Sequence, residues 1–211
     1  GLDVCAAYRA AQRGRMRKAA LITGGARRLG REIALHLAAR GYDIALHYHR
    51  SKKDAEQTAA DIRALGVECK LFAADLEKPE SHDALIENAH AAFPALFVLV
   101  NNASVFDAGR FKESGRALYE KEFRVNLEAP VFLTHAFAER VGKGAVVNMI
   151  DSSVSKHQHS YFYYLLSKKA LMAFTQMAAA ELAPEIRVNG VCPGYVLPAQ
   201  GWGDDYREEL E

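Results

Sequence analysis

The chain has 211 residues, of which 50% are hydrophobic and 25% charged, and its formal net charge at pH 7 is +1. This is the composition of an ordinary globular protein long enough for a sizeable core, and it excludes intrinsic disorder, collagen and coiled coil. The apolar runs are far shorter than the ~20 residues that span a bilayer, so we expect no transmembrane helix and no membrane partner.

The first segment in chain order is basic. Residues 1–20 contain five basic side chains and one acidic side chain. We interpret residues 1–17 as a leader or a cloning remnant, with Met16 as the start of the protein. The alternatives are an arm that binds nucleic acid and a targeting segment. Because the rest of the chain is slightly acidic and offers no basic face, we expect no nucleic-acid partner for the domain.

From residue 18 onward, short apolar runs alternate with amphipathic segments. The runs are continuous, as in strands covered on both faces, and predict strands over 18–23, 42–48, 67–74, 96–101, 145–150 and 186–191. Helical periodicity predicts helices over 28–40, 53–65, 80–92, 116–140 (broken near Pro130) and 161–183. Gly41 and Gly66 follow two of these helices as stops. The alternation predicts an α/β fold: one doubly wound, Rossmann-type domain over 18–211, with a mostly parallel sheet and helices on both faces.

A glycine-rich loop joins the first predicted strand to the first predicted helix. Residues 23–30 read Thr-Gly-Gly-Ala-Arg-Arg-Leu-Gly, at the edge of the sheet where ligands of such folds bind. Glycine lets the backbone turn tightly and approach a pyrophosphate, whose charge is stabilised by the helix N-terminus. In this strand–loop–helix context, Gly24 and Gly30 predict a nucleotide site rather than a simple turn.

The end of the second predicted strand indicates which dinucleotide binds. An NAD site needs a carboxylate there for the ribose 2′-hydroxyl, but residues 47–51 read His-Tyr-His-Arg-Ser. Arginine, imidazole and hydroxyl groups, with Arg27 and Arg28 in the preceding loop, are donors suited to a 2′-phosphate. The sequence therefore predicts NADPH/NADP+ as the cofactor rather than a solvated strand end. No Cys/His spacing is typical of a metal site, so we expect no metal.

Tyr164 and Lys168 lie four residues apart on the last predicted helix, so their side chains share one face. A nearby cation lowers the pKa of a phenol and makes it usable as a general acid. Tyr161 and Tyr163 have no lysine at the fourth position, and we expect them to pack in the core or against a substrate.

Four signals then occur in order: the glycine-rich loop, Leu-Val-Asn-Asn-Ala at 99–103, Val-Asn at 125–126, and the Tyr164/Lys168 pair. With this combination the chain resembles the short-chain dehydrogenase/reductase family over about residues 18–200, including a Pro-Gly pair at 193–194 that resembles the cofactor loop of that family.

The resemblance implies a catalytic quartet of Asn, Ser, Tyr and Lys. Asn126, Tyr164 and Lys168 match it, whereas Asp151 stands thirteen residues before the tyrosine, where the family has serine. Together with Arg28 in the glycine loop, this aspartate narrows the resemblance to pteridine reductases and dihydromonapterin reductases. The run 46–51 and the sequence Asn-Ala-Ser at 102–104, followed by Phe106, support the same subfamily.

This narrower resemblance implies NADPH-dependent transfer of hydride to a dihydropterin C=N bond. It implies cofactor contacts at Gly24, Arg28, Leu29, Gly30, Tyr48, His49, Arg50, Ser51, Asp75, Leu76, Asn102, Ala103, Ser104, Lys168, Pro193 and Gly194. Tyr164 with Asp151 would deliver the proton, Lys168 would hold the nicotinamide ribose and lower the Tyr164 pKa, and Asn126 would anchor a water. Substrate would contact Phe106, Asp151 and Tyr164, with Phe106 stacking on the pterin ring; a core-packing role is the alternative for Phe106.

Two other functions stay open. The first is a generalist carbonyl reductase, such as a 3-oxoacyl thioester reductase, against which Asp151 and the aromatic residues argue. The second is a non-catalytic regulator that binds NADP(H), against which the retention of Tyr164, Lys168 and Asn126 argues, because a binding module needs no proton relay.

The same resemblance implies a homotetramer, and the three scattered cysteines favour a reducing, cytoplasmic compartment over a disulfide framework. Family members usually continue for a strand and a helix beyond residue 211, and carry a substrate-loop helix near residues 202–206. We therefore expect the domain to lack the usual C-terminal strand.

Overall fold

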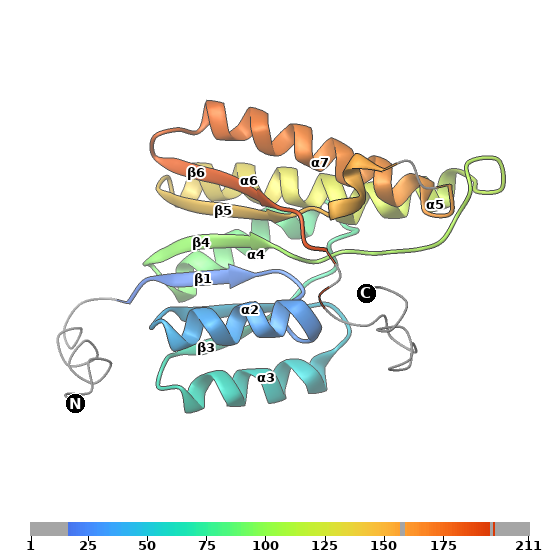
Figure 1. Cartoon of the computed structure of the whole chain (residues 1–211). Helices are drawn as coiled ribbons and strands as arrows, with labels where there is room; N and C mark the ends of the chain where they lie inside the picture. The colour runs from blue at the N-terminus through green and yellow to red at the C-terminus, as the bar shows by residue number, and fades with distance from the viewer. Residues whose placement is uncertain (1–16, 157–158, 195, 197–211) are drawn as a thin grey trace.

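Six parallel strands form one sheet with helices on both faces (Figure 1). The computed structural model describes residues 17–156, 159–194 and 196. The predicted basic arm, except Arg17, and the predicted substrate-loop helix near residues 202–206 lie outside the described residues. The predicted α/β fold with a parallel sheet is confirmed.

The strands are β1 (Ala19–Ile22), β2 (Asp43–Tyr48), β3 (Cys69–Ala73), β4 (Leu96–Asn101), β5 (Gly144–Met149) and β6 (Ile186–Val191). Their order across the sheet is β3-β2-β1-β4-β5-β6, and every pairing is parallel. The chain builds outward from β1 to β3 on one side and from β4 to β6 on the other. The order therefore switches between β1 and β4, and ligands of α/β sheets bind at the carboxyl ends of the strands at such a point.

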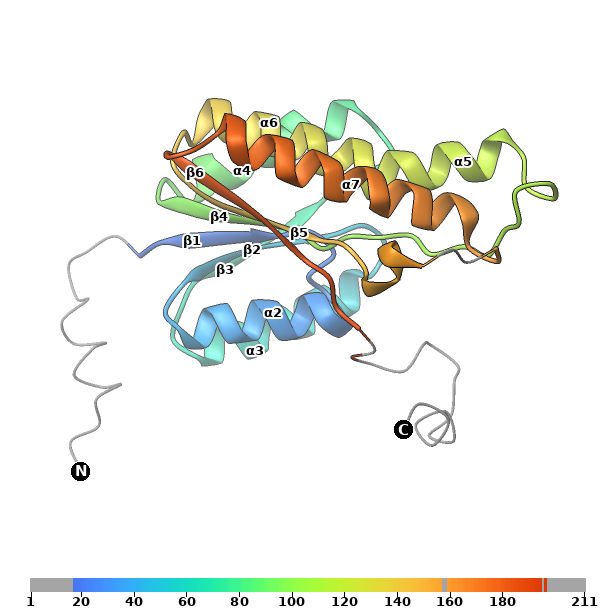
Figure 2. The ribbon, with the colours of Figure 1, turned by 45° about the horizontal axis from the view of Figure 1, so that its top comes forward.

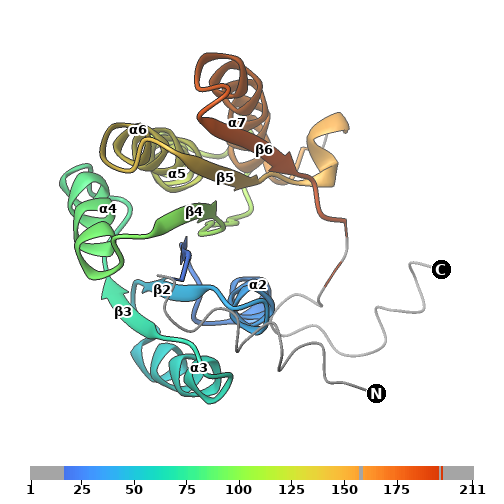
Figure 3. The same ribbon diagram turned by 90° about the vertical axis from the view of Figure 1, so that its left-hand side faces the viewer.

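The helices are α2 (Arg28–Ala39), α3 (Lys52–Ala64), α4 (Glu80–Ala92), α5 (Arg116–Phe123), α6 (Ala129–Arg140) and α7 (Phe162–Glu181). Helices α2 and α3 cover one face of the sheet, and α4 to α7 cover the other (Figures 2 and 3). Within the part of the chain that the structure describes, no helix is long and apolar enough to cross a membrane.

Each face of the sheet buries its own apolar layer. In β1, Leu21 packs in the layer that contains Leu133 of α6, whereas Ile22 packs in the layer that contains Ile62 of α3. Both β1 side chains are fully buried. Because successive side chains of a strand point to opposite faces, burial on both faces makes such strands read as continuous apolar runs.

The predicted helix over 116–140 is broken near Pro130, as expected, and the break is a π-helical turn. A π-helical turn, η1 (Arg124–Glu128), separates α5 from α6 and lies before Pro130. Pro130 occupies the first turn of α6. Proline has no N–H to donate, and its ring excludes a regular helical bond to the carbonyl four residues earlier, that of Asn126. The helix therefore widens around Asn126, and π-turns of this kind are frequent at functional sites. All other predicted elements are present, with ends within two residues of those expected.

Candidate active site

A cavity of about 550 Å³ opens beside the carboxyl ends of the central strands. It is lined by the loop after β1, the end of β2, and the residues that follow β3 and β4. The predicted cofactor residues found in its lining are Gly24, Arg28, Leu29, Gly30, Tyr48, His49, Arg50, Ser51, Asp75, Leu76, Asn102, Ala103 and Ser104. Lys168, Pro193 and Gly194 are described by the structure but do not line this cavity.

The loop after β1 follows a backbone path that leaves little room for a side chain at Gly24 and none at Gly30. Gly24 has a φ of 62°, in the left-handed region that favours glycine. A Cβ on Gly30 would lie against the Gly24 carbonyl and 2.6 Å from the side-chain nitrogen of Asn102. Arg28 also has a left-handed φ, of 51°, which costs a residue with a side chain about 1 kcal/mol. Arg28 thus stands where the backbone conformation favours glycine.

Two polar residues fasten this loop to the end of β4. The side-chain nitrogen of Asn102 donates to the carbonyls of Thr23, at 2.9 Å, and Gly24, at 3.2 Å. The Thr23 hydroxyl oxygen accepts the backbone N–H groups of Asn102 and Ala103, each at 2.9 Å. The side chain of Asn102 is therefore engaged in holding the loop, and so is that of Thr23, for which no individual role was predicted.

His47 fastens the same loop to β2. Its side chain is 2% exposed, its Nδ1 accepts the Gly24 N–H at 3.0 Å, and its Nε2 lies 3.1 Å from the Ala74 carbonyl, to which it donates. Accepting at one nitrogen and donating at the other requires the neutral ring. Burial lowers the pKa of His47 to about 4, consistent with that neutral form. Of the two imidazoles at 47–51, only His49 is therefore available for a 2′-phosphate. The position of His47 inside an apolar strand was the sequence feature that could have indicated its burial.

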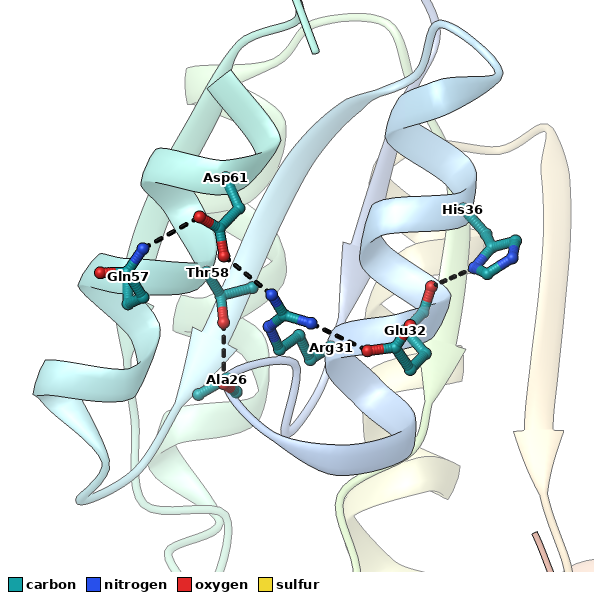
Figure 4. Close-up of polar contacts among 7 residues, drawn as sticks. All are labelled: Ala26, Arg31, Glu32, His36, Gln57, Thr58 and Asp61. Atoms are coloured by element: carbon teal, nitrogen blue, oxygen red, sulfur yellow. Dashed lines mark hydrogen bonds and ion pairs between the residues drawn. The ribbon is translucent and has the colours of Figure 1, made fainter. Parts of the chain in front are cut away.

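Helix α3 supports the loop after β1 through the contacts drawn in Figure 4. The buried Thr58 hydroxyl donates to the Ala26 carbonyl at 2.9 Å. Arg31 of α2 bonds the carboxylate of Asp61 on α3 at 2.8 Å, and Gln57 donates to the same carboxylate at 2.9 Å. These contacts join the loop and α2 to α3.

The end of β2 presents donors to the cavity. Arg50 is exposed at this end, and His49 lies 3.7 Å from the Asp75 carboxylate. Ser51 precedes α3, and its side chain makes no capping bond to that helix. A guanidinium, an imidazole and a hydroxyl beside the N-terminus of a helix form a suitable donor set for a phosphate group.

Tyr164 and Asp151 meet on the other side of the sheet's switch point. The Tyr164 hydroxyl donates to Oδ2 of Asp151 at 2.7 Å, and the other carboxylate oxygen, Oδ1, accepts the Ser153 N–H at 2.6 Å. Asp151 therefore caps the 3₁₀ turn η2 (Ser152–Ser155) and bonds the phenol at once. Burial, followed by the bond to Asp151, raises the pKa of Tyr164 above its usual value.

Lys168 lies one helical turn from Tyr164 and is 3% exposed. Its ammonium donates to the Met149 carbonyl at 2.9 Å and stands 5.8 Å from the centre of the Tyr164 ring. Burial lowers the pKa of Lys168 to about 8, against the attraction of Asp151 and Glu122. The net effect of the surroundings is thus to raise the pKa of Tyr164, chiefly through burial and the bond to Asp151, and the lowering by Lys168 stays a prediction.

Asn126 uses its side chain to hold the segment after β4. Its Oδ1 accepts the Ser104 hydroxyl at 2.9 Å and the Val105 N–H at 3.0 Å. Its Nδ2 donates to the Val105 carbonyl at 3.0 Å and to Glu122 at 2.6 Å. The side-chain amide of Asn126 is therefore fully engaged, and its predicted role as a water anchor stays a prediction, one that its backbone would have to fulfil.

Phe106 forms an aromatic wall beside the phenol. Its ring stacks on Tyr161 at a centroid distance of 4.2 Å, meets Tyr164 edge-on at 4.6 Å, and the residue is 57% exposed. Tyr163 packs instead against Phe111 and Tyr119. A ring this exposed is not a core-packing residue, and it places an aromatic face next to the Tyr164–Asp151 pair.

A family model described as short chain dehydrogenase matches residues 18–207. Pteridine reductase 1 of Leishmania tarentolae is 36% identical, over 90% of this chain and 82% of the relative. The 3-oxoacyl-(acyl-carrier-protein) reductase FabG of Staphylococcus aureus is 30% identical, over 93% of this chain and 82% of the relative.

Two solved structures are similar over most of the described fold. FolM alternative dihydrofolate reductase 1 from Brucella suis, in complex with NADP, has a TM-score of 0.81 and 38% identity, covering 86% of this chain and 76% of that one. Its counterpart from Brucella canis, also complexed with NADP, has a TM-score of 0.85 and 36% identity, covering 93% of this chain and 80% of that one. The family predicted from the sequence is confirmed.

Proposed function

The chain belongs to the short-chain dehydrogenase family, and on that premise we propose that it is an NADPH-dependent reductase of a dihydropterin C=N bond. A pteridine reductase and two FolM alternative dihydrofolate reductases in complex with NADP, each at least 36% identical to the chain, support the substrate class and the cofactor. The observation that carries the proposal is the bond from Tyr164 to Asp151 at the position where the family pattern has serine.

Three features of the cavity suit NADPH: the glycines that let the backbone of the loop after β1 approach a ligand, the N-terminus of α2, and the hydrogen-bond donors at the end of β2. Gly24, Leu29 and Gly30 would lie against the diphosphate, and Arg50 with its neighbours would hold the 2′-phosphate. When bound, NADPH supplies the hydride from its nicotinamide ring. We assign the nicotinamide ribose to Lys168, and a further part of the cofactor to Pro193 and Gly194.

Tyr164 and Asp151 form the proton-donating pair of this proposal. Reduction of a C=N bond adds hydride to the carbon and a proton to the nitrogen. Burial and the Asp151 carboxylate keep the Tyr164 phenol protonated, as its raised pKa indicates, so the phenol holds the proton that the nitrogen receives. Lys168 keeps positive charge close to the pair, and Asn126 supports the segment on which substrate rests.

Asp151 favours a pterin over a ketone as the substrate, because a carboxylate and a serine hydroxyl differ in their ability to donate a hydrogen bond. A serine hydroxyl donates to a carbonyl oxygen, whereas an ionised carboxylate only accepts. Acceptors suit a ring that presents N–H groups, and the Phe106 ring with Tyr161 offers a face on which a flat heterocycle stacks. A pterin has both properties.

A 3-oxoacyl thioester reductase is the second candidate, because FabG of Staphylococcus aureus is 30% identical over 93% of the chain. A non-catalytic NADP(H)-binding regulator is the third candidate, and it gives no reason for Asp151 to lie together with the buried Tyr164 and Lys168. We therefore place both behind the pterin reductase.

We further propose that the domain, over 18–211, works as a cytoplasmic homotetramer without a nucleic-acid partner. Exposed apolar side chains on α6 and α7, namely Phe132, Leu166 and Met177, give surfaces that a second copy could cover. Sedimentation of the purified protein measures the number of subunits directly.

The test of function is NADPH oxidation with dihydrobiopterin, dihydromonapterin, dihydrofolate and an acetoacetyl thioester as separate substrates. We expect turnover of at least one pterin and weak or no turnover of the thioester. Asp151→Ser should lose most pterin reduction, keep its affinity for NADPH, and gain weak ketone reduction. Thioester turnover that exceeds that of every pterin would replace the proposal by the second candidate, and an Asp151→Ser enzyme with the parent's pterin turnover would remove Asp151 from it.

A further inference from the structure

Glu122 is a buried carboxylate that the proposed reaction does not use. It lies on α5 and is 0% exposed. Its Oε1 accepts the backbone N–H of Asp107 at 2.8 Å, and its Oε2 accepts Nδ2 of Asn126 at 2.6 Å. Burying a carboxylate is unfavourable unless its oxygens are hydrogen-bonded, and here both are.

The two bonds of Glu122 act on opposite ends of one short segment, Ser104–Asp107. One bond reaches Asp107 directly. The other orients Asn126, whose side chain bonds Ser104 and both backbone groups of Val105. Phe106 lies between these anchored positions, with its own ring exposed beside Tyr164. The position of Phe106 therefore depends on residues to either side of it that Glu122 and Asn126 hold.

We propose that Glu122 is a positioning residue of the substrate site, which fixes the segment Ser104–Asp107 so that Phe106 presents its ring beside Tyr164. The inference rests on the proposed function, because the ring of Phe106 matters for turnover only when an aromatic substrate stacks on it. Glu122 acts through Asn126 and the Asp107 backbone and touches neither substrate nor cofactor.

The chemistry of the network requires a carboxylate at this position. Glu122 receives two N–H donors, so an amide in its place would accept one and turn its own N–H toward the other. Rotation of the Asn126 amide would not resolve this, because Oδ1 of Asn126 would then leave the Val105 N–H facing a nitrogen donor. Glu122→Gln therefore leaves one buried N–H donor without an acceptor in every arrangement. The same substitution of a surface carboxylate leaves no buried donor unpaired.

A second tether on Asp107 does not replace the first. Lys121 forms an ion pair with the Asp107 carboxylate at 2.6 Å, but both side chains are 42% exposed. Exposed ion pairs contribute little to holding a structure, because solvent screens them. Glu122 bonds the backbone of Asp107 in the interior, so it defines where the chain lies.

The experiment compares Glu122→Gln with the matched surface variant Glu120→Gln, the same substitution on a partly exposed residue of α5 that pairs with Arg116. Assays at about pH 8 keep Glu122 ionised in the parent, because burial raises its pKa to about 7. For Glu122→Gln we expect the KM for dihydropterin to rise about tenfold or more, with NADPH affinity within about twofold of the parent. Glu120→Gln should match the parent in both measurements.

A double-variant cycle with Phe106 tests the route of the effect. If Glu122 acts by placing the ring of Phe106, Glu122→Gln should raise the KM for dihydropterin about tenfold in the parent background. In a Phe106→Leu background the same substitution should raise it by no more than about twofold, because the ring is then absent. A merely structural role of Glu122 would raise the KM by the same factor in both backgrounds.

An unchanged pterin KM in Glu122→Gln, or equal losses of pterin and NADPH binding, would overturn the inference. If Glu122→Gln does not fold, Glu122→Asp, whose shorter side chain keeps the carboxylate but does not reach both donors, carries the same comparison: a pterin KM that rises only when Phe106 is present supports the inference, and any other result rejects it. A parent enzyme that reduces no pterin would reject the proposed function instead, which separates the two failures.

Discussion

The two sides of the site are held in place by different kinds of group. At the cofactor side, the loop after β1 is fastened by neutral side chains: His47, Thr23 and the amide of Asn102. At the substrate side, two carboxylates take part in fixing the chain, the buried Glu122 and the partly buried Asp151, together with the buried amide of Asn126. The first arrangement suits an anionic ligand, because none of these three side chains carries a negative charge that would oppose a diphosphate. The second suits a ligand that presents N–H groups.

This difference has an electrostatic consequence. Burial lowers the pKa of His47 to about 4 and raises the pKa of Glu122 to about 7, so each group is driven toward its neutral form. For His47 the neutral form is the one its contacts need. For Glu122 the ionised form is needed, so the substrate side is held against the preference of its surroundings. Substitutions at the cofactor side and at the substrate side should therefore show their effects in different measurements.

The largest effect is expected from Tyr164→Phe, which removes the proton donor from the substrate side and leaves the cofactor side intact. Turnover should fall by ~10²–10⁴-fold, the range for a lost general acid, while NADPH affinity stays close to that of the parent. Single-turnover oxidation of NADPH and fluorescence titration measure the two quantities. Tyr163→Phe is the control, because Tyr163 packs against Phe111 and Tyr119. Parent-like turnover in Tyr164→Phe would remove this residue from the reaction.

The next largest effects are two opposite pH dependences of the free energy of unfolding, one from His47 and one from Glu122. The pKa of His47 is lowered on folding, so its contribution is complete above about pH 6.5 and is lost as the pH falls through about 4. The pKa of Glu122 is raised on folding, so its contribution is complete below about pH 4.5 and is lost as the pH rises through about 7. Each amounts to about 3 kcal/mol at most, and the two oppose each other in the parent.

Denaturant unfolding between about pH 4.5 and 6.5 separates these contributions. Because His47→Asn removes the titrating imidazole, its free energy of unfolding relative to that of the parent should fall as the pH rises across this window. Because Glu122→Gln removes the titrating carboxyl, its free energy of unfolding relative to that of the parent should rise. Slopes that both variants share with the parent would show that neither group titrates differently on folding.

Arg50→Ala tests the cofactor side alone. If this guanidinium holds a 2′-phosphate, the variant should bind NADPH ~1.5–3 kcal/mol more weakly and bind NADH almost unchanged. Isothermal titration with both cofactors gives the two affinities, and pterin KM at saturating NADPH should match the parent. Equal losses for NADPH and NADH would mean that Arg50 does not contact the phosphate.

The smallest effect concerns the left-handed backbone of Arg28. Arg28→Gly and Arg28→Ala both remove the guanidinium, but only alanine keeps the strain of a φ near 51°. The glycine variant should therefore be more stable than the alanine variant by about 1 kcal/mol in thermal unfolding without cofactor. Both should lose NADPH affinity to the same extent. A more stable alanine variant would show that this residue leaves the left-handed region when its side chain is shortened.

The elements and the cofactor side were largely predictable from the sequence, because local signals specify them. Burial on both faces leaves continuous apolar runs, so each strand could be located within two residues. The glycine loop and the Tyr164/Lys168 pair are recognisable because their geometry depends on neighbours along the chain. The break near Pro130 was predicted, but its form as a π-turn was not, because the proline acts on a carbonyl four residues earlier rather than at its own position.

Only the tertiary structure distinguished Glu122 from Glu120. In the sequence both are acidic residues of one short charged helix, and nothing in its periodicity indicates which one is buried. The fold packs the segment after β4 over α5, so Glu122 is enclosed with two backbone-linked donors while Glu120 stays partly exposed. The same kind of long-range contact placed Tyr161 under Phe106 and His47 against Gly24. Local sequence thus determined which elements form and which residues could react, whereas the packing of distant segments decided which polar groups are buried, what they bond and which protonation state they need.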